Sequence, residues 1–491
     1  MGAIAKSLPT RRAFLAGAGT LALARRTAAA GAPPRIGIVG AGIAGLTAAL
    51  TLRDAGLAAT VYESSGRVGG RMFSNTTFFG SQVSEWCGEF INSNHVVVRS
   101  LAARFNLPLE DVNAAQPPGS TGTNWFDGRY YPWPEIQKGL QEIYPVLNSQ
   151  NAAAGYPTLY NQYTAAGFAL DHISVYEWIE RYVPRGHASE LGQLLDIAVV
   201  TEYGLDTAEQ SALNMVYYGT GDEKYHIAAG NQALPMAIAN SLPTGDVLLG
   251  WRLAAIAARP DGAISLTFDT PAGAREVAFD QVILALPFSV LRKLDFGQAG
   301  FDALKITAIT QLGYGTNSKL HLQFDDRYWN GQGPWGVGNG FSYSSEPFES
   351  TWDASRAQAG TNGLLVDYTG GSEGAGYRPP TPYSTSQSSP LVEQFAQQLL
   401  AQLEAPWPGI AQHYTGKATL SYPTGDPNKL GSYACWKVGQ YTEFAGYEKV
   451  AQGNIHFAGE HCSVNFQGYM EGGAREGIRA AKEILADHAI Y

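Results

Sequence analysis

A glycine-rich turn between a predicted strand and a predicted helix constrains this chain more than any other feature. Ile36–Val39 mixes apolar residues with a small one, which predicts a buried strand, and apolar residues at helical spacing follow over Leu46–Leu52. The pattern G-x-G-x-x-G lies between them. Its first glycine lets the chain turn, its second lets the backbone approach a pyrophosphate, and its third lets the helix pack closely on the strand. The helix N-terminus would direct its N–H groups at that pyrophosphate. The candidate ligand-binding residues here are Gly40, Gly42, Ala44 and Gly45.

The next predicted strand ends on an acid that suits an adenosine. Residues 59–62 predict this strand, and Glu63 follows directly. A carboxylate there can accept hydrogen bonds from both ribose hydroxyls. An ordinary β-α-β unit with a glycine turn is the alternative interpretation.

A glycine pair flanked by arginines comes next and suits a second approach to phosphates, whose charge the guanidiniums would neutralise. Its candidate residues are Arg67, Gly70 and Arg71.

The stretch from Ile36 to Arg71 resembles the N-terminus of flavin-dependent amine oxidases, the family of monoamine, polyamine and L-amino-acid oxidases. The resemblance implies FAD as the cofactor. It also implies an α/β (α+β) fold, with a Rossmann-type FAD-binding domain and a substrate-binding domain of mixed sheet plus helices. In that fold the backbone near Leu253 would meet the adenine.

The C-terminal segment is similar to the flavin-binding segment of the same family. Residues 455–457 predict a short strand, and a tight turn through Gly459 and Glu460 follows at its carboxyl end, where open α/β sheets bind ligands. A helix from about Gly468 would present its N-terminus to the flavin pyrimidine, which becomes negative on reduction. Tyr469 and Met470 complete this group of candidates.

Lys319 and two tyrosines are the candidate catalytic residues. The strand predicted over 317–324 alternates and places Lys319 on its polar face. The resemblance implies that this lysine reaches flavin N5 through a water, whereas a solvent-facing strand lysine is the alternative. Tyr433 and Tyr469 fall where the family places two rings face to face in front of the flavin, with Trp436 as a support. Such a pair would guide an amine to the flavin.

The segment 88–91 enters the substrate cavity in the family, so Glu89 and Phe90 are candidate substrate-binding residues. Better-known L-amino-acid oxidases carry an arginine here that clamps the substrate carboxylate. This chain has none, which weakens the case for an ordinary L-amino acid, although an arginine farther along could reach in. Glu89 either attracts a cation, such as the far end of a diamine or a basic amino acid, or pairs with a flavin-site arginine such as Arg71.

The implied reaction is oxidation of a C–N bond in a small-molecule amine or amino acid, with O2 as the second substrate. The imine product hydrolyses to a carbonyl compound, and peroxide is released. No metal is implied. Two alternatives remain open: a dehydrogenase of the same fold that passes electrons to a carrier, and an enzyme that desaturates or isomerises C–C bonds.

Some family members attach the flavin to a cysteine, but here the matching motif is Gly-Ser-Tyr, with Cys435 two residues beyond Tyr433. This departure predicts non-covalent FAD.

The length of 491 residues favours two domains. The FAD-binding domain is predicted over 35–95, 225–300 and 415–491, and the substrate-binding domain over 96–224 and 301–414. Helical spacing over 136–147, 175–182, 190–199 and 208–217 predicts helices in the latter. Its tyrosines are cavity candidates, although each one singly is more often a packing residue: Tyr144, Tyr160, Tyr163, Tyr203, Tyr217 and Tyr218.

The first 31 residues predict a twin-arginine signal peptide. Arg11 and Arg12 precede a weakly apolar stretch, and Ala28–Ala30 supplies small residues for cleavage. The protein is therefore expected in the periplasm or secreted, without a membrane span. A net charge of −10 argues against nucleic acid as a partner. A homodimer is possible by analogy with the family.

Overall fold

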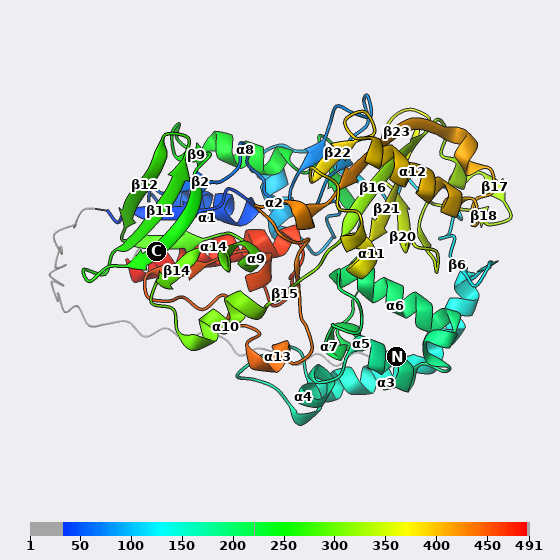
Figure 1. Ribbon diagram of the computed structural model, residues 1–491, viewed down its shortest axis with the longest axis horizontal. Coiled ribbons are helices and arrows are strands. Elements are labelled where there is room, and N and C mark those ends of the chain that lie inside the picture. The colour runs from blue at the N-terminus through cyan, green and yellow to red at the C-terminus, as the bar shows by residue number, and fades with distance from the viewer. Residues whose placement is uncertain (1–32, 220, 489–491) are drawn as a thin grey trace, which may run out of the picture. The chain divides into compact units, whose positions relative to one another are not determined.

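The computed structural model describes residues 33–219 and 221–488, and the predicted signal peptide lies outside them. From Pro34 onward the chain forms one compact unit. It is built around two large sheets, with the helices α3 to α7 beside the second (Figure 1).

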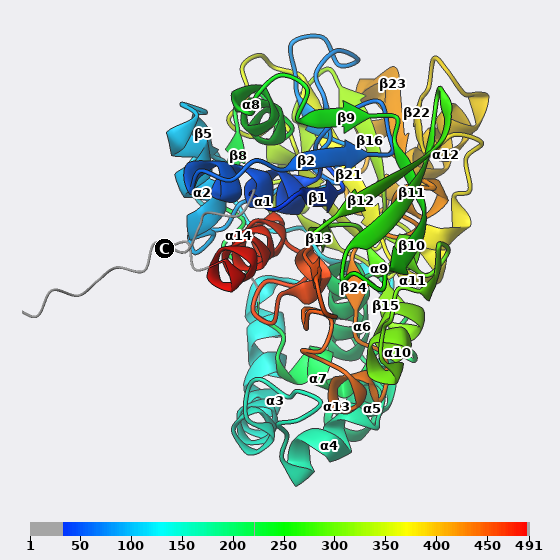
Figure 2. The same cartoon turned by 90° about the vertical axis from the view of Figure 1, so that its left-hand side faces the viewer.

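The first sheet has five strands, all parallel, in the order β25 (Ile455–Phe457), β13 (Gln281–Leu284), β1 (Ile36–Val39), β2 (Thr60–Glu63) and β9 (Val247–Leu249). Helix α1 (Ile43–Asp54) connects β1 to β2 and packs against α14 (Met470–Asp487). The first and last helices of the unit therefore lie side by side, as Figures 1 and 2 both show.

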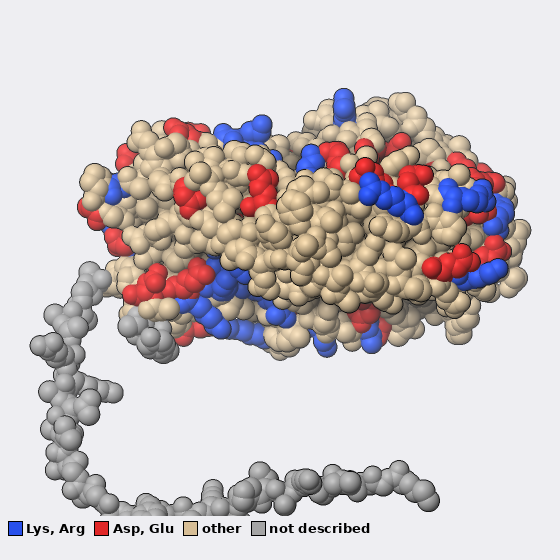
Figure 3. Space-filling model, turned by 90° about the horizontal axis from the view of Figure 1, so that it is seen from below, with Lys and Arg blue, Asp and Glu red and all other residues tan. Residues whose placement is uncertain are grey.

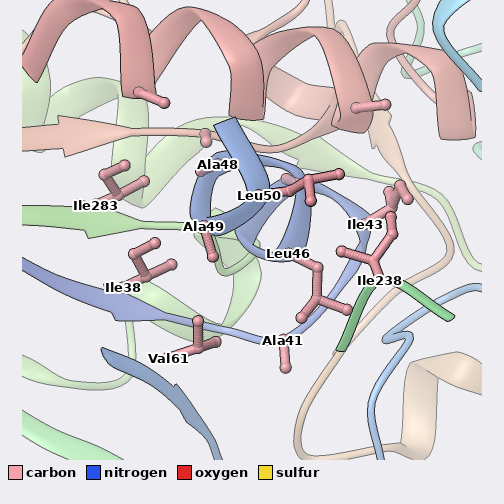
Figure 4. Packing of buried hydrophobic residues seen from close by; sticks show 14 of the residues in the cluster. Ile38, Ala41, Ile43, Leu46, Ala48, Ala49, Leu50, Val61, Ile238 and Ile283 are labelled. Atoms are coloured by element: carbon pink, nitrogen blue, oxygen red, sulfur yellow. The ribbon is translucent and has the colours of Figure 1, made fainter. Parts of the chain in front are cut away.

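Helix α1 is apolar nearly all round because it is buried between the sheet and α14. In Figure 4, Ile38, Val61 and Ile283 point at this helix from three neighbouring strands, while α14 crosses its other side. Each fully buried aliphatic side chain of this kind contributes roughly 1.5–3 kcal/mol to folding. The apolar residues of β1 and α1 that flank the glycine turn thus also form the core beneath it.

The predicted roles of two glycines are confirmed. Gly40 has φ +104°, a conformation that favours glycine. A Cβ on Gly45 would lie 1.9 Å from the Gly40 carbonyl oxygen, so only glycine allows α1 to pack this closely.

A smaller sheet covers the other face of the parallel one. Its order is β12 (Gly273–Phe279), β11 (Ile264–Thr270), β10 (Arg252–Ala258) and β14 (Asp295–Gln298). Residues from both sheets form a second core, which includes Phe268, Phe279 and Val282.

The second large sheet has six strands in the order β19 (Ser342–Tyr343), β20 (Ser350–Asp353), β21 (Gly363–Thr369), β16 (Ser318–Phe324), β23 (Tyr414–Ser421) and β22 (Tyr383–Thr385). Its strand pairs are antiparallel throughout rather than mixed. Helix α12 (Pro390–Leu403) packs on one face through a third core. Every residue of β16 is buried, because the strand is central and both of its faces are covered.

Beside this sheet lie α3 (Trp133–Ala154), α4 (Ala165–Asp171), α5 (Val175–Tyr182), α6 (Glu190–Tyr203) and α7 (Ala212–Val216). They share a core, and α6 contacts β19 and β21. The helix predicted over 208–217 is shorter than expected, because the Ser211 side chain caps α7 by accepting from the Leu213 N–H.

Further elements are α2 (Val96–Arg104), α8 (Ala233–Ser241), α9 (Phe288–Leu291), α10 (Ala303–Gln311), α11 (Gly371–Gly376), α13 (Gln440–Glu443), β3 (Ser74–Asn75), β4 (Ser84–Glu85), β5 (Leu109–Asp111), β6 (Trp125–Phe126), β7 (Arg129–Tyr130), β8 (Tyr225–Ile227), β15 (Gly313–Tyr314), β17 (Gln332–Gly333), β18 (Gly336–Val337) and β24 (Ala434–Cys435). The predicted fold class is confirmed. The domain boundaries stay a prediction, and α2, on the far side of the boundary expected at residue 96, packs with α14 in the first core.

Across residues 33–219 and 221–488, no helix combines the length and apolarity that crossing a membrane requires. On the face shown in Figure 3, acidic and basic side chains are interspersed around a largely uncharged middle.

Candidate functional site

A cavity of about 1000 Å³ begins at the carboxyl ends of the parallel strands. It continues past β16 and β21 to the ends of α6 and α7. The sequence-predicted residues that line it are Gly40, Gly42, Ala44, Glu63, Arg67, Gly70, Arg71, Glu89, Phe90, Leu253, Lys319, Tyr433, Trp436, Gly459, Glu460, Gly468, Tyr469 and Met470. Gly45 is not part of the lining, since its role is the close packing of α1 on β1.

One end of the cavity is shaped to receive a phosphate-bearing chain. A Cβ on Gly70 would lie 3.3 Å from the Cα of Gly42, so the two glycine-rich loops approach each other closely. Helix α1 begins beside them with no side-chain cap, which leaves its N-terminal N–H groups and positive dipole end free for an anion. Arg67 is held by the carbonyls of Val68 and Gly70 and lies over the ring of Phe73.

Glu63 lies at the end of β2, where the sequence predicted it. Its carboxylate accepts from the Ala41 N–H at 2.8 Å through Oε2 and from the Ser65 N–H at 2.9 Å through Oε1. It therefore ties the glycine turn to the following loop. The Ser65 hydroxyl also donates to Oε1 at 2.7 Å. A carboxylate has about four acceptor positions, so one position on Oε2 remains for a ribose hydroxyl. Leu253 lines this same end of the cavity.

Glu460 organises the middle of the cavity. Its Oε1 accepts from Arg71 Nη1 at 2.7 Å, and its Oε2 accepts from the Gly468 N–H at 2.8 Å. Helix α14 starts directly afterwards, with Tyr469 at the N-cap position and no side-chain cap. A second open helix N-terminus thus faces the cavity, suited to a group that becomes negative.

These features fit FAD. Two uncapped helix N-termini face one elongated cavity, and polar atoms along its wall have no hydrogen-bond partner among the described residues. His461 is only 1% exposed and both of its ring nitrogens are unpartnered, as is Nε2 of Gln467. Buried polar groups are rarely left without partners, so these atoms point to a polar ligand beside them.

Lys319 is buried, with 6% exposure, so the alternative of a solvent-facing strand lysine is wrong. Its Nζ donates to Glu89 Oε2 and to the Cys87 carbonyl, both at 2.7 Å. Trp352 Nε1 donates to the other oxygen of Glu89 at 2.9 Å. Burial raises the pKa of the Glu89 carboxyl, but the facing Lys319 charge and the hydrogen bonds from Lys319 and Trp352 together outweigh it, so the net pKa is lowered. A fixed ammonium group therefore lies at the cavity wall.

The predicted pairing of Glu89 with a flavin-site arginine is wrong, because Arg71 pairs with Glu460 and Glu89 pairs with Lys319. The short distance between β16 and the 85–89 segment brings these two charges together. The charge of Glu89 is therefore already neutralised, which also weakens its predicted role in attracting a substrate cation.

Tyr433 and Tyr469 line the same part of the cavity, and each hydroxyl is anchored to a different partner. The Tyr433 hydroxyl lies 2.8 Å from the Tyr368 hydroxyl and donates to the Thr201 carbonyl at 3.0 Å. The Tyr469 hydroxyl donates to Glu202 Oε1 at 2.7 Å. Burial raises the pKa of both phenols. Both rings are thus held by their hydroxyl ends, and their role as a cage stays a prediction.

Trp436 lines the cavity from a cluster with Tyr441 and Phe444, at ring distances of 5.1 and 5.7 Å. Its neighbour Cys435 is fully buried and is not part of the cavity lining, because successive residues of β24 point to opposite sides.

The sequence missed Glu202 and Glu223, which both line the cavity. Glu202 lies on the last turn of α6, three residues past the helix end predicted at 199. A charged residue in the apolar run of α6 was the available signal. Of the predicted cavity tyrosines, Tyr203, Tyr217 and Tyr218 line it, but Tyr144 and Tyr163 are exposed and Tyr160 is not part of the lining.

Comparison with known proteins places the chain in a family. The family of flavin containing amine oxidoreductases matches residues 43–485, and the chain belongs to it. One relative is the putative L-amino-acid oxidase YobN of Bacillus subtilis (strain 168), which is 26% identical over 92% of this chain and 95% of that protein. The L-amino-acid oxidase of Mus musculus is 24% identical over 92% of this chain and 71% of that protein. Polyamine oxidase 4 of Oryza sativa subsp. japonica is 23% identical over 92% of this chain and 88% of that protein.

Solved structures share the fold. Cyclohexylamine oxidase from Brevibacterium oxydans IH-35A aligns with a TM-score of 0.77 and 21% identity, covering 93% of this chain and 100% of that one. Wild-type putrescine oxidase bound to putrescine also gives a TM-score of 0.77, at 19% identity, covering 92% and 99%.

Proposed function

We propose that this protein is an FAD-dependent amine oxidase that converts a small amine or amino acid to its imine and reduces O2 to H2O2. One observation carries the proposal. The buried Lys319, the anchored tyrosines Tyr433 and Tyr469 and the open N-terminus of α14 all line one cavity, continuous with the glycine-rich phosphate cradle.

FAD bound there would accept two electrons from the C–N bond and pass them to oxygen, and water would then hydrolyse the imine to a carbonyl compound and ammonia. The chain supplies binding, orientation and electrostatics. The N-terminus of α14 and the Lys319 ammonium favour negative charge in their part of the cavity. Tyr433 and Tyr469 offer ring faces to a substrate amine. The buried walls exclude bulk water and so strengthen each of these interactions.

The test is a panel of monoamines, diamines, polyamines and L-amino acids with the purified FAD-loaded protein. Flavin absorbance would be followed without oxygen, and peroxide would be followed under air. We expect bleaching and peroxide with one class of amine. Bleaching without peroxide would indicate a dehydrogenase that uses a carrier. If no amine bleaches the bound flavin, the proposal fails and C–C chemistry becomes the better hypothesis.

We expect FAD to be held without a covalent bond. Cys435, near the position where some relatives attach the flavin, is buried outside the cavity lining, and burial raises the pKa of its thiol, which disfavours the reactive thiolate. Acid precipitation of the protein will therefore release all yellow colour to the supernatant. Cys87 lines the cavity, so it is the second cysteine that has to be tested as an attachment point. Flavin that stays in the pellet, but is released in Cys87→Ser or Cys435→Ser, would contradict this expectation and identify the attachment.

We also propose twin-arginine export, on the strength of the sequence alone. Residues 1–31 fused to a reporter that folds before export will direct it across the bacterial inner membrane, and Arg11→Lys with Arg12→Lys will stop this. The pair Arg25→Lys and Arg26→Lys is the matched control, since these arginines lie beyond the apolar stretch. Equal export by both double variants would contradict the proposal. The homodimer stays a prediction.

A further inference from the structure

The substrate end of the cavity contains a carboxylate enclosed by aromatic hydroxyls. Glu202 lines the cavity from the last turn of α6, and one of its oxygens accepts from Tyr469. Burial, and with it the charge of Glu202, raises the pKa of six phenols that also line the cavity: Tyr203, Tyr218, Tyr343, Tyr368, Tyr433 and Tyr469. The cavity wall beyond the predicted tyrosine pair is therefore an acid with tyrosine side chains around it.

Helix stability does not explain Glu202. A carboxylate in the last turn of a helix meets the negative end of the helix dipole, which disfavours it. The helix is instead ended by Gly204, which adopts the left-handed conformation with φ 78°. Glu202 is partly buried and lowers the stability of its own helix. Its position on the cavity wall suggests that it serves ligand binding instead.

A second carboxylate, Glu223, lines the same cavity, and its side chain is exposed rather than buried. Among the described residues, no Lys, Arg or His nitrogen lies within 4.0 Å of either of these carboxylates. By contrast, Glu89 is paired with Lys319 and Glu460 with Arg71. The charges of Arg356 and Lys319 act on Glu223 from beyond ion-pair distance, but neither acid is paired directly with a protein cation. Tyrosine rings, which can attract cations, line the same part of the cavity.

We propose that Glu202, Glu223 and the surrounding tyrosines recognise a second positive charge on the substrate. The substrate is then an amine whose far end carries another ammonium group, as in a linear diamine or a basic amino acid. This inference rests on the proposed oxidase function and deepens it. It also assigns to these two acids the cation recognition that the sequence had suggested for Glu89.

The experiment compares substrates that match in length and differ in the second charge. The pairs are 1,4-diaminobutane with 1-aminobutane, 1,5-diaminopentane with 1-aminopentane, and L-lysine with L-norleucine. The wild-type enzyme is expected to favour the dication at least tenfold in kcat/KM in one set of pairs. The set that shows the preference distinguishes a diamine from a basic amino acid.

Glu202→Gln and Glu223→Gln are each expected to reduce that preference at least fivefold, mainly through KM, while the monocation changes less than threefold. Glutamine keeps an oxygen that can accept from Tyr469, so the variant at 202 removes the charge and retains the anchor. Glu142→Gln, on the exposed side of α3, is the control and should leave the preference unchanged.

The outcomes separate the two proposals. If the wild-type enzyme oxidises monocations as well as dications, the recognition of a second charge is overturned while the oxidase function stands. It is also overturned if the glutamine variants lower both members of a pair equally, since that result would indicate a role in positioning Tyr469. If no amine of either kind reduces the bound flavin, the oxidase function itself fails. The wild-type comparison needs no variant and remains decisive if one does not fold.

Discussion

Replacing Lys319 with methionine will slow the reoxidation of the reduced enzyme by oxygen by about 100- to 1,000-fold, the range expected when one preorganised stabilising group is removed from a dry site. Methionine keeps the length of the side chain but removes the only ammonium that contacts Glu89 among the described residues. Substrate reduction of the flavin should change less. Stopped-flow mixing of the reduced protein with oxygenated buffer measures reoxidation, and anaerobic mixing of the oxidised protein with substrate measures flavin reduction.

The same substitution leaves Glu89 buried without its partner, which costs about 3–5 kcal/mol for a broken buried pair. The double variant Lys319→Met with Glu89→Gln is the matched control, because it removes both charges. We expect it to recover most of the free energy of unfolding but none of the reoxidation rate. A double variant that recovers both would show that Lys319 acts only through stability.

The pH dependence of unfolding has a defined sign. Because the net pKa of Glu89 is lowered in the folded protein, its ionised form stabilises the fold above pH 4.5, and this contribution is lost as pH falls through the folded-state pKa. Without Lys319 the burial effect remains and favours the protonated acid. The difference in unfolding free energy between wild type and Lys319→Met will therefore be largest near pH 7 and shrink below pH 4.5. A constant difference across this range would contradict the ion-pair explanation.

Replacing Gly45 with alanine will lower both stability and FAD retention. The new Cβ would lie 1.9 Å from the Gly40 carbonyl oxygen and 3.2 Å from the Ile38 side chain, so α1 must move away from β1. Overpacking of this kind costs about 1–3 kcal/mol or more. The displaced helix start also carries the N–H groups predicted to hold the pyrophosphate. The ratio of flavin to protein absorbance after gel filtration and the thermal midpoint measure the two effects.

Gly376→Ala is the matched control, because a Cβ there meets no atom within 4 Å and the residue lies outside the cavity lining. It should retain FAD and the wild-type midpoint. Full retention of FAD by Gly45→Ala, with an unchanged midpoint, would show that α1 can shift freely and that the close packing does not position the cofactor site.

The glycine turn and the strand that ends on Glu63 lie where the sequence predicted them because their constraints are local. A left-handed turn requires Gly40, and a strand that ends on Glu63 is visible in a few adjacent residues. The pairing of Lys319 with Glu89 was not visible, since it joins positions 230 residues apart and depends on how β16 passes the 85–89 segment. Glu202 was missed because its place on the cavity wall follows from where α6 ends. Tyr144 was placed wrongly because helical spacing alone does not tell which side of a helix faces a cavity, and Tyr163 was placed wrongly because it lies in the loop before α4, where no periodic pattern applies.

The contact of Glu460 with Arg71 has a consequence for how the protein is made. The two residues are 389 positions apart, and β25 and α14, which complete the parallel sheet and cover α1, are the last elements of the chain. The nucleotide cradle can therefore close only after the ribosome has released the chain through α14. Until then the apolar surface of α1 lacks its cover, and we expect the growing chain to depend on chaperones and to take up FAD only after α14 has been made.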